Sequence, residues 1–200
     1  MSNTLLNPPF IHPTAVVERD VSISEGCKVW HFCHVRSGVV LEANVSLGKD
    51  VFVDEGVRIG KGSRVQNGVS VYKGVEIDTW CFVGPHVIFT NDLTPRAGNL
   101  KWDVIRTILK PGASIGAGSV IRCGITLGEF SLVGAGAIVT KDVHPFHVAT
   151  GFPAELTKMV CACGRTLFPL RTEQSKLISD CCESVMDPEL FTIARAKLKI

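Results

Sequence analysis

An aliphatic or aromatic residue recurs at every sixth position over most of this 200-residue chain. The first run has no gaps and comprises Ile11, Val17, Ile23, Val29, Val35, Leu41, Leu47, Val53, Ile59, Val65, Val71, Ile77, Val83 and Phe89. A second run, in a new register, comprises Leu109, Ile115, Ile121, Leu127, Val133 and Val139. In a chain that is 46% hydrophobic, such a series arises by chance roughly once in several million sequences. The period of six therefore reflects the fold.

A period of six suits neither an α-helix, which repeats every 3.6 residues, nor a two-sided strand, which repeats every two. Glycine often follows the periodic residue, as at Gly48, Gly60 and Gly116, which is typical of a short strand ending in a corner. Three such units make one triangular coil whose periodic residues stack inward over those of the coil below. The sequence therefore predicts an all-β solenoid with three parallel sheets, although the repeat alone does not give its hand.

Composition narrows the cellular setting and the partners. The formal net charge is only +2 and the basic residues are scattered, so we expect no nucleic-acid partner. No stretch approaches the ~20 apolar residues of a membrane span, and the first ten residues lack the features of a secretory signal. We expect a cytoplasmic protein without membrane contact. The eight cysteines are then expected as reduced thiols, because half of them lie within the apolar repeats, namely Cys27, Cys33, Cys81 and Cys123.

The later repeats have a specific form. Ile115-Gly116-Ala117-Gly118-Ser119-Val120 and Val133-Gly134-Ala135-Gly136-Ala137-Ile138 resemble the hexads of the hexapeptide-repeat acyltransferase superfamily, and Gly151-Phe152-Pro153-Ala154 resembles the turn that ends its coils. The resemblance implies a left-handed parallel β-helix. We accordingly predict a β-helix domain over residues 1–155 and a tail over 156–200.

The two runs of repeats are out of step with each other. From Phe89 to Leu109 the chain advances twenty residues, which is not a multiple of six, so part of the segment 90–108 must leave the coil as a loop. A loop that interrupts a regular scaffold is a favoured place for function.

Three segments carry a narrower resemblance. They are Trp30-His31-Phe32-Cys33-His34-Val35, Gln66-Asn67-Gly68-Val69-Ser70-Val71-Tyr72, and Val87-Ile88-Phe89-Thr90-Asn91-Asp92 followed by Pro95-Arg96-Ala97. In this order they resemble the nucleotide-sugar 3-N-acetyltransferases. That family transfers acetyl from acetyl-CoA to the 3-amino group of UDP- or dTDP-linked amino sugars for surface polysaccharides such as the lipopolysaccharide O-antigen. The resemblance implies this activity here.

Such a reaction requires an unprotonated amine to attack a thioester carbonyl. Asn91, which matches the family's active-site asparagine, can accept a hydrogen bond from the amine and orient its lone pair, but it cannot take a proton. Asp92 is the adjacent carboxylate if a general base is needed, although an ordinary aspartate is a weak base near neutral pH. A solvated turn carboxylate is the alternative interpretation of Asp92. We predict Asn91 and Asp92 as the catalytic pair.

The histidines leave other possibilities open. His31 and His34 are three residues apart, so we expect them on different faces of the coil, and either one has a structural role as its alternative. His86 is a further candidate near the loop, whereas His12 opens a His-Pro-Thr-Ala motif and is expected to be structural. A γ-class carbonic anhydrase, with three histidines holding zinc between subunits, is a weaker alternative because the spacing of His31 and His34 does not fit it. The non-enzymatic alternative is an assembly scaffold.

The superfamily resemblance also implies where the substrates bind and how the chain assembles. Coenzyme A is expected along the later coils between two subunits, at Ala117, Ala135, Lys141, Pro153 and Lys158. The nucleotide-linked sugar is expected at the earlier coils and the loop, at His34, Arg36, Gln66, Asn67 and Arg96. Either arginine suits a diphosphate or a sugar carboxylate. Because both sites lie between chains, the resemblance implies a homotrimer.

The tail after residue 155 lacks hexads. Asp187 followed by Pro188 and spaced apolar residues predicts a capped helix over about 188–199. Upstream, four thiols in two groups are weak candidates for a zinc site, namely Cys161, Cys163, Cys181 and Cys182. Neither pair has the usual Cys-x2-Cys spacing, and adjacent cysteines would be strained on one ion. From spacing alone we therefore expect buried thiols and little bound metal.

Overall fold

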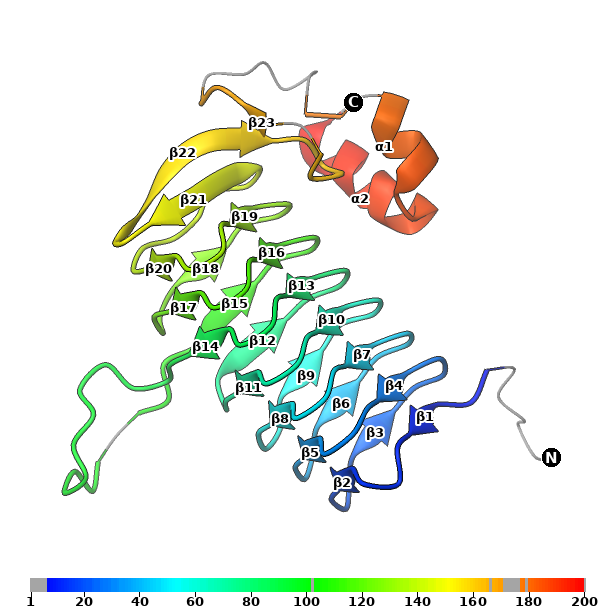
Figure 1. Cartoon of the computed structure of the whole chain (residues 1–200), viewed down its shortest axis with the longest axis vertical. Coiled ribbons are helices and arrows are strands. Elements are labelled where there is room, and N and C mark those ends of the chain that lie inside the picture. Colours follow the sequence, from blue (N-terminus) through cyan, green and yellow to red (C-terminus); the bar gives the residue numbers. More distant parts are fainter. Residues whose placement is uncertain (1–6, 102, 166, 171–176, 179, 200) are drawn as a thin grey trace.

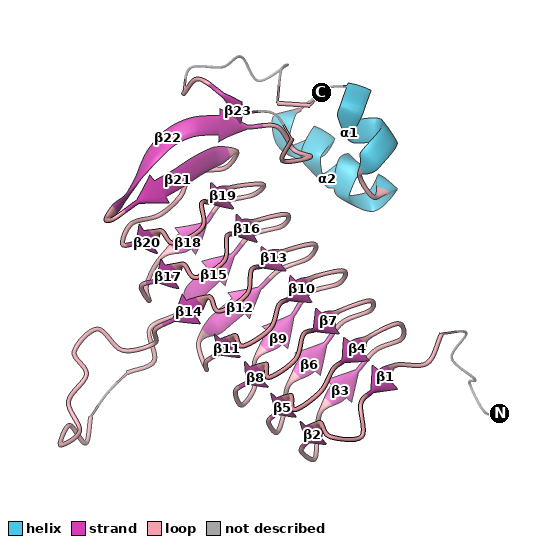
Figure 2. Cartoon of the chain, viewed as in Figure 1, coloured by secondary structure: helices cyan, strands magenta, loops and turns pink. Residues whose placement is uncertain are grey.

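The chain winds into a triangular parallel β-solenoid that carries a small tail at one end (Figure 1). The computed structural model describes residues 7–101, 103–165, 167–170, 177–178 and 180–199, with backbone only at 167, 168, 180 and 181. Within these residues the strands form sheets of ten, seven and six strands, which we name sheets A, B and C (Figure 2). The predicted β-solenoid is confirmed.

Each coil contributes one short strand to each sheet. Sheet A consists of β1 (Phe10–Ile11), β4 (Lys28–Val29), β7 (Ser46–Leu47), β10 (Arg64–Val65), β13 (Phe82–Val83), β16 (Ser114–Ile115), β19 (Leu132–Val133), β21 (His147–Gly151), β22 (Ala154–Val160) and β23 (Leu167–Phe168). Sheet B consists of β2 (Val16–Val17), β5 (His34–Val35), β8 (Phe52–Val53), β11 (Ser70–Val71), β14 (Ile88–Phe89), β17 (Val120–Ile121) and β20 (Ile138–Val139). Sheet C consists of β3 (Ser22–Ile23), β6 (Val40–Leu41), β9 (Arg58–Ile59), β12 (Val75–Ile77), β15 (Thr107–Leu109) and β18 (Thr126–Leu127).

The periodic residues form the core. In each two-residue strand of the coils the second residue is the hexad residue, and from Val29 onward none of these is more than 2% exposed. Regular coils repeat every eighteen residues, as when Val29 pairs with Leu47. Across the loop, Ile77 instead pairs with Leu109, thirty-two residues on. The extra residues are the insertion that the broken period predicted, and the coil resumes at Thr107 rather than after residue 108.

The glycine after the hexad residue has a steric cause. At Gly116, a Cβ atom would lie 2.4 Å from the backbone nitrogen of Ala135 in the next coil. Consecutive coils approach too closely at this corner for any side chain, so only glycine fits.

The tail begins as an extension of sheet A. β21 and β22 form an antiparallel hairpin, and β22 runs across residue 155. Two helices follow, α1 (Asp180–Val185) and α2 (Pro188–Leu198). The predicted helix is confirmed as α2, whose cap Asp187 accepts a hydrogen bond from the Glu189 backbone N–H. α1 was not predicted. No helix among the described residues is long and apolar enough to cross a membrane.

The tail packs against the last coils through a second, smaller core. Phe130 and Phe146, from corners of the last coils, stack with ring centroids 5.1 Å apart. Leu177, Ala194 and Leu198 of the tail are buried with them. The Lys61–Glu189 and Lys197–Glu129 ion pairs add polar contacts between α2 and the coils.

The inward and outward positions of one strand should differ sharply in their effect on stability. Leu47→Ala removes a fully buried side chain, so the free energy of unfolding should fall by about 2–5 kcal/mol. Ser46→Ala, on the outward face of the same strand, should change it by no more than about 0.5 kcal/mol. Denaturant unfolding followed by circular dichroism, at one protein concentration, measures both. Equal losses would contradict the assigned register of β7.

Candidate active site

The inserted loop leaves the coil directly after β14, at the corner between sheets B and C, and projects away from the solenoid (Figure 1). At its neck, the Thr90 side chain accepts a hydrogen bond from the backbone N–H of Cys123 at 2.9 Å. The backbone N–H of Ile105 donates to the carbonyl of Asn91 at 3.2 Å. The returning chain is held by an ion pair between Arg106 and Glu76 of sheet C. The neck therefore holds Asn91 against the coils.

Asn91 and Asp92 differ in how their side chains are engaged. Both are half-buried, whereas the described residues 93–101 are exposed. Asp92 accepts a hydrogen bond from the backbone N–H of Thr94 at 2.7 Å, which closes a local turn. The side-chain amide of Asn91 has no hydrogen-bond partner within the described part of the chain. Asn91 is thus the residue at the neck whose polar group is available to a ligand.

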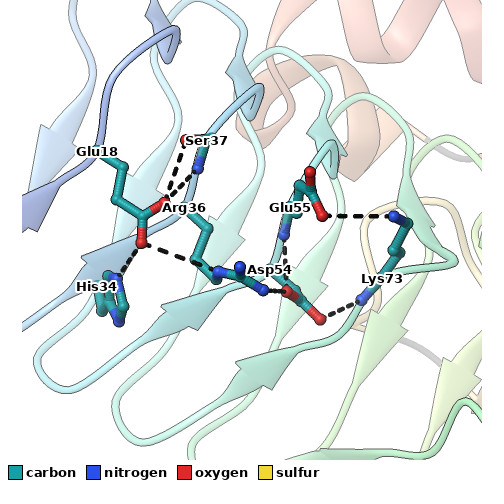
Figure 3. A network of polar contacts seen from close by, with 7 residues as sticks. All are labelled: Glu18, His34, Arg36, Ser37, Asp54, Glu55 and Lys73. Carbon is teal, nitrogen blue, oxygen red and sulfur yellow. Dashed lines mark hydrogen bonds and ion pairs between the residues drawn. The ribbon is translucent and has the colours of Figure 1, made fainter.

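A network of charges occupies the same B–C corner in the earlier coils (Figure 3). Glu18 accepts hydrogen bonds from the backbone N–H of Ser37 at 2.9 Å and from its hydroxyl at 3.2 Å, and it lies 2.8 Å from Nε2 of His34. Arg36 donates to Asp54 at 2.7 Å, and its Nε lies 3.9 Å from Glu18. The network orients His34 through Glu18, leaving 43% of the histidine side chain exposed.

The network extends one coil further. Asp54 accepts hydrogen bonds from the backbone N–H groups of Glu55 and Lys73, and the Lys73 ammonium lies 3.5 Å from Glu55. These contacts fix the Asp54 carboxylate at the centre of the corner. Glu18, Arg36 and Asp54 occupy one position of three successive coils, eighteen residues apart. That spacing is the sequence signal that would have found Glu18 and Asp54, which the sequence analysis missed.

Hydrogen bonding favours the ionised forms of Glu18 and Asp54. The hydrogen bonds from His34 and from the Ser37 backbone lower the pKa of Glu18. Burial opposes ionisation of Asp54, but the hydrogen bonds from the Glu55 and Lys73 backbones and from Arg36 outweigh it and lower its pKa. The network sets three acidic side chains, Glu18, Asp54 and Glu55, against two basic ones, Arg36 and Lys73. Arg36 is therefore already neutralised.

The second predicted arginine is in a different state. Arg96 is exposed in the loop, and its Nη1 donates to the carbonyl of Pro95 at 2.8 Å. No ion pair to Arg96 occurs in the segments that the structure describes. Its charge is thus more available to an anion than that of Arg36.

The other predicted sugar contacts, Gln66 and Asn67, lie at the opposite end of the sheet B strands, at the corner between sheets A and B. Gln66 and Asn67 follow β10, and Asn67 Oδ1 accepts from the Lys49 backbone N–H at 2.9 Å. His86 lies one coil further, its ring beside Gly68, where a Cβ atom would come within 2.5 Å of Nδ1. Within a single chain, Asn67 and Asn91 therefore lie at opposite ends of the sheet B strands, at different corners of the coil.

The two early histidines also separate, as expected. His31 lies at the A–B corner, stacked on His12 with ring centroids 3.5 Å apart, whereas His34 lies on the outward face of sheet B. His12 Nδ1 is 2.9 Å from the Thr14 hydroxyl, which fits a structural role in the first coil.

The predicted coenzyme A residues lie along the later coils. Ala117 and Ala135 are exposed at the A–B corner of adjacent coils, where the Gly136 backbone N–H donates to the Ala117 carbonyl. Pro153 is exposed in the turn between β21 and β22, above them in the same column of corners. Lys141 lines a hollow of about 320 Å³ near the last coil and lies 3.5 Å from Glu155, while Lys158 is exposed on β22.

A larger groove, of about 1300 Å³, runs along the outer face of sheet C. Its walls include Arg58, Lys73, Glu76 and the end of the loop at Val104 and Arg106. None of the predicted catalytic or substrate-binding residues lines it. The candidate site therefore lies along sheet B and its two corners rather than in this groove.

Comparisons with known proteins match both the repeat and a shorter region. A family model described as the hexapeptide repeat of succinyl-transferase matches residues 38–73 and 112–141. A dTDP-3-amino-3,6-dideoxy-α-D-galactopyranose 3-N-acetyltransferase from Aneurinibacillus thermoaerophilus is 52% identical over 58 residues, 29% of this chain and 30% of that protein. The bifunctional protein GlmU of Nitratidesulfovibrio vulgaris strain DP4 is 32% identical over 122 residues, 61% of this chain and 25% of GlmU. The matched region thus spans less than a third of either relative.

Solved structures share the fold. A hexapeptide transferase family protein from Anaplasma phagocytophilum matches 96% of this chain and 87% of its own, with a TM-score of 0.53 and 17% identity. A galactoside acetyltransferase solved with coenzyme A matches 61% of this chain and 64% of its own, with a TM-score of 0.54 and 24% identity. At these identities the likeness concerns the fold. Together with the matched repeats, it shows that the chain contains hexapeptide repeats wound into the β-solenoid fold of these structures.

Proposed function

We propose that this protein is an acetyl-CoA-dependent N-acetyltransferase that acts on the 3-amino group of a UDP- or dTDP-linked sugar used for surface polysaccharides such as the O-antigen. The observation that carries the proposal is Asn91, half-buried at the neck of the inserted loop with its amide available to a ligand. The relative that is 52% identical over 58 residues bears the name of a dTDP-linked amino sugar 3-N-acetyltransferase, which supports this substrate class. Such an enzyme would work in the cytoplasm, where it meets acetyl-CoA.

In the proposed mechanism Asn91 orients the amine. The neutral amine nitrogen forms a bond to the thioester carbonyl carbon, the carbon–sulfur bond breaks, and coenzyme A leaves as its thiol after taking up the proton lost from nitrogen. Asn91 Oδ1 accepts a hydrogen bond from the amine and directs its lone pair at the carbonyl. Holding the two substrates in line supplies much of the acceleration, and polar groups stabilise the oxyanion. Asp92 is held by Thr94 in a turn, which favours a role in fixing the neck.

A trimer would complete the site. Besides His34 and Ser70, the outward row of sheet B contains the apolar residues Val16, Phe52, Ile88, Val120 and Ile138. Val16 and Ile88 are 57% and 53% exposed in one chain. In the proposed trimer each of the three chains turns its sheet B toward a common axis, and this row is buried. The same arrangement sets the A–B corner of one chain against the B–C corner of the next. Asn67, Ala117 and Ala135 of one chain would then face Asn91 of its neighbour, with coenzyme A and the nucleotide sugar between them.

Arg36 and Arg96 differ in their ion pairs, and this difference suggests different roles for the two arginines. A diphosphate requires an uncompensated cation, which favours Arg96 over Arg36. Arg36 instead holds the Glu18–His34 pair in place through Glu18 and Asp54. His34, with Gln66 and Asn67, is then left to contact the sugar or the base. Lys141, Lys158 and Pro153 are proposed to contact coenzyme A.

The catalytic proposal is tested by variants of the loop neck, assayed for acetyl-CoA consumption with a panel of UDP- and dTDP-linked 3-amino sugars. Asn91→Ala should lower kcat about 30- to 1000-fold, since a hydrogen bond made in the transition state contributes about 2–4 kcal/mol. Asp92→Asn should retain most activity, and so should the control Asn99→Ala in the exposed part of the loop. The rate should rise with pH as the substrate amine deprotonates, without a histidine-like inflection of the protein.

Two outcomes would contradict this mechanism. Loss of kcat in His34→Ala or Asp92→Asn, with Asn91→Ala still active, would assign the reaction to a protein base such as the His34–Glu18 pair. Absence of thioester cleavage with every sugar on the panel, and of thermal stabilisation by acetyl-CoA, would favour the scaffold alternative.

The division between the arginines makes a separate prediction. Arg96→Ala should raise KM for the nucleotide sugar at least tenfold, with KM for acetyl-CoA unchanged. Arg36→Ala should raise KM for the nucleotide sugar less than Arg96→Ala does, because it disturbs the orientation of His34, a sugar contact, rather than removing an anion contact. Steady-state kinetics at saturating co-substrate distinguishes the two. A KM effect confined to Arg36→Ala would reverse the assignment.

The assembly prediction uses two matched substitutions on different sheets. Ile88→Asp puts a carboxylate into the apolar row of sheet B, and its burial in an interface should be strongly unfavourable. Light scattering at micromolar concentration should report a trimer for the wild type and for Val40→Asp on sheet C, and a smaller species for Ile88→Asp. A monomeric wild type would exclude the proposed trimer and the site built on it.

A further inference from the structure

Three thiols, none of them among the residues of the candidate active site, converge where the tail joins the solenoid. Sγ of Cys161 lies 3.1 Å from that of Cys182 and 3.6 Å from that of Cys163. All three sulfur atoms lie within 4.8 Å of one another. In a tetrahedral zinc site, Zn–S bonds of about 2.3 Å set the sulfur atoms about 3.8 Å apart. We propose that Cys161, Cys163 and Cys182 bind a structural zinc ion.

The local backbone explains why the spacing in sequence gave the opposite expectation. Cys161 follows β22, and the chain then turns back, with the Gly164 backbone N–H donating to the Cys161 carbonyl at 2.7 Å. Gly164 has a φ of +75°, a conformation that glycine adopts without strain. This turn brings Cys163 beside Cys161, although only one residue separates them. The third thiol comes from α1, so the site is assembled by the fold of the tail rather than by two Cys-x2-Cys knuckles. Cys181, the remaining candidate, has its side chain outside the described residues.

The donor set is selective for a soft metal ion. Three sulfur donors favour Zn²⁺ over Mg²⁺ or Ca²⁺, which prefer oxygen ligands. Cys161 and Cys182 are buried at 1% and 0% exposure, whereas Cys163 is half-buried, so an ion can reach the site from the side of Cys163. Binding would displace the thiol protons, and a water molecule or a fourth side chain would complete the coordination.

The tail also needs such a link. Of its residues in the second core only Leu177, Ala194 and Leu198 are buried, and the others, such as Met186 and Leu190, are only partly buried. Its helices are six and eleven residues long, which is short for stability without strong packing. A metal bound by Cys161, Cys163 and Cys182 would join the end of β22, the following turn and α1. Small elements with little core of their own are commonly stabilised in this way.

A disulfide between Cys161 and Cys182 is the competing use of the same thiols. The two sulfur atoms are not bonded, since a disulfide bond is about 2.05 Å long. A disulfide would leave Cys163 without a role, whereas a metal site uses all three thiols.

The test begins with the wild-type chain, prepared without chelator and analysed for metal. We expect about one zinc ion per chain, and after chelation and addition of cobalt(II) we expect the visible absorption of tetrahedral thiolate-bound cobalt. Cys163→Ser and Cys182→Ser should each lower zinc content or affinity at least tenfold. Cys33→Ser, in a coil remote from the tail, should leave both unchanged.

Several results would overturn the proposal. One is a wild-type chain that is free of zinc and gives no thiolate–cobalt spectrum on reconstitution. Another is a Cys161–Cys182 disulfide found by mass spectrometry in freshly prepared protein. A third is equal loss of metal in Cys33→Ser. The wild-type measurements decide the matter even if a tail variant fails to fold. Because none of the thiols belongs to the candidate active site, these outcomes are independent of the acetyltransferase assay.

Discussion

The stacking of one inward residue per strand on the residue eighteen positions later is the constraint on which the rest of the structure depends. Val29 over Leu47, and Leu47 over Val65, form columns with almost no exposed surface, and the backbone hydrogen bonds between coils follow the same register. No coil can bury its apolar face alone, so each depends on its neighbours. A repeat of six must therefore persist along the chain, and any additional residues must leave the coil as a loop at a corner. The loop that carries Asn91 is such an insertion.

The same period governs the outer surface, where it creates columns of side chains rather than isolated ones. Glu18, Arg36 and Asp54 form one column, and their alternating charges hold the B–C corner together. Once the coil is known to consist of three hexads, this alternation is readable from the sequence at a spacing of eighteen. The family resemblance and the charge of Arg36 together suggested an anion contact for it. The structure instead gives it two carboxylate partners, so its available charge is small.

Most of the fold could be predicted because hexads are local and repetitive. The loop was located by a break in the count, and α2 was located by Asp187 and Pro188 at its start. What escaped prediction depends on distant contacts. Asn67 and Asn91 belong to motifs that resemble the same family, yet within one chain they lie at opposite ends of the sheet B strands. The separation follows from the hexad count, because Asn67 and Asn91 are twenty-four residues, or four hexads, apart and three hexads make one coil. This separation favours the proposed site between chains over a site within one chain.

The tail shows the limit of spacing arguments in a different way. Rules such as Cys-x2-Cys describe thiols that a single tight turn brings together, and they miss ligands supplied by separate elements. Cys161 and Cys163 are joined by the turn that ends at Gly164, whereas Cys182 arrives from a helix about twenty residues later. Leu177 lies between the turn and the helix in the sequence. It is buried with Phe130 and Phe146 of the coils, and this burial holds the helix near the turn. The convergence of the thiols is thus a product of hydrophobic packing against the last coils. If that packing were lost, the three thiols would no longer be held together. The order of the tail therefore depends on the solenoid against which it packs.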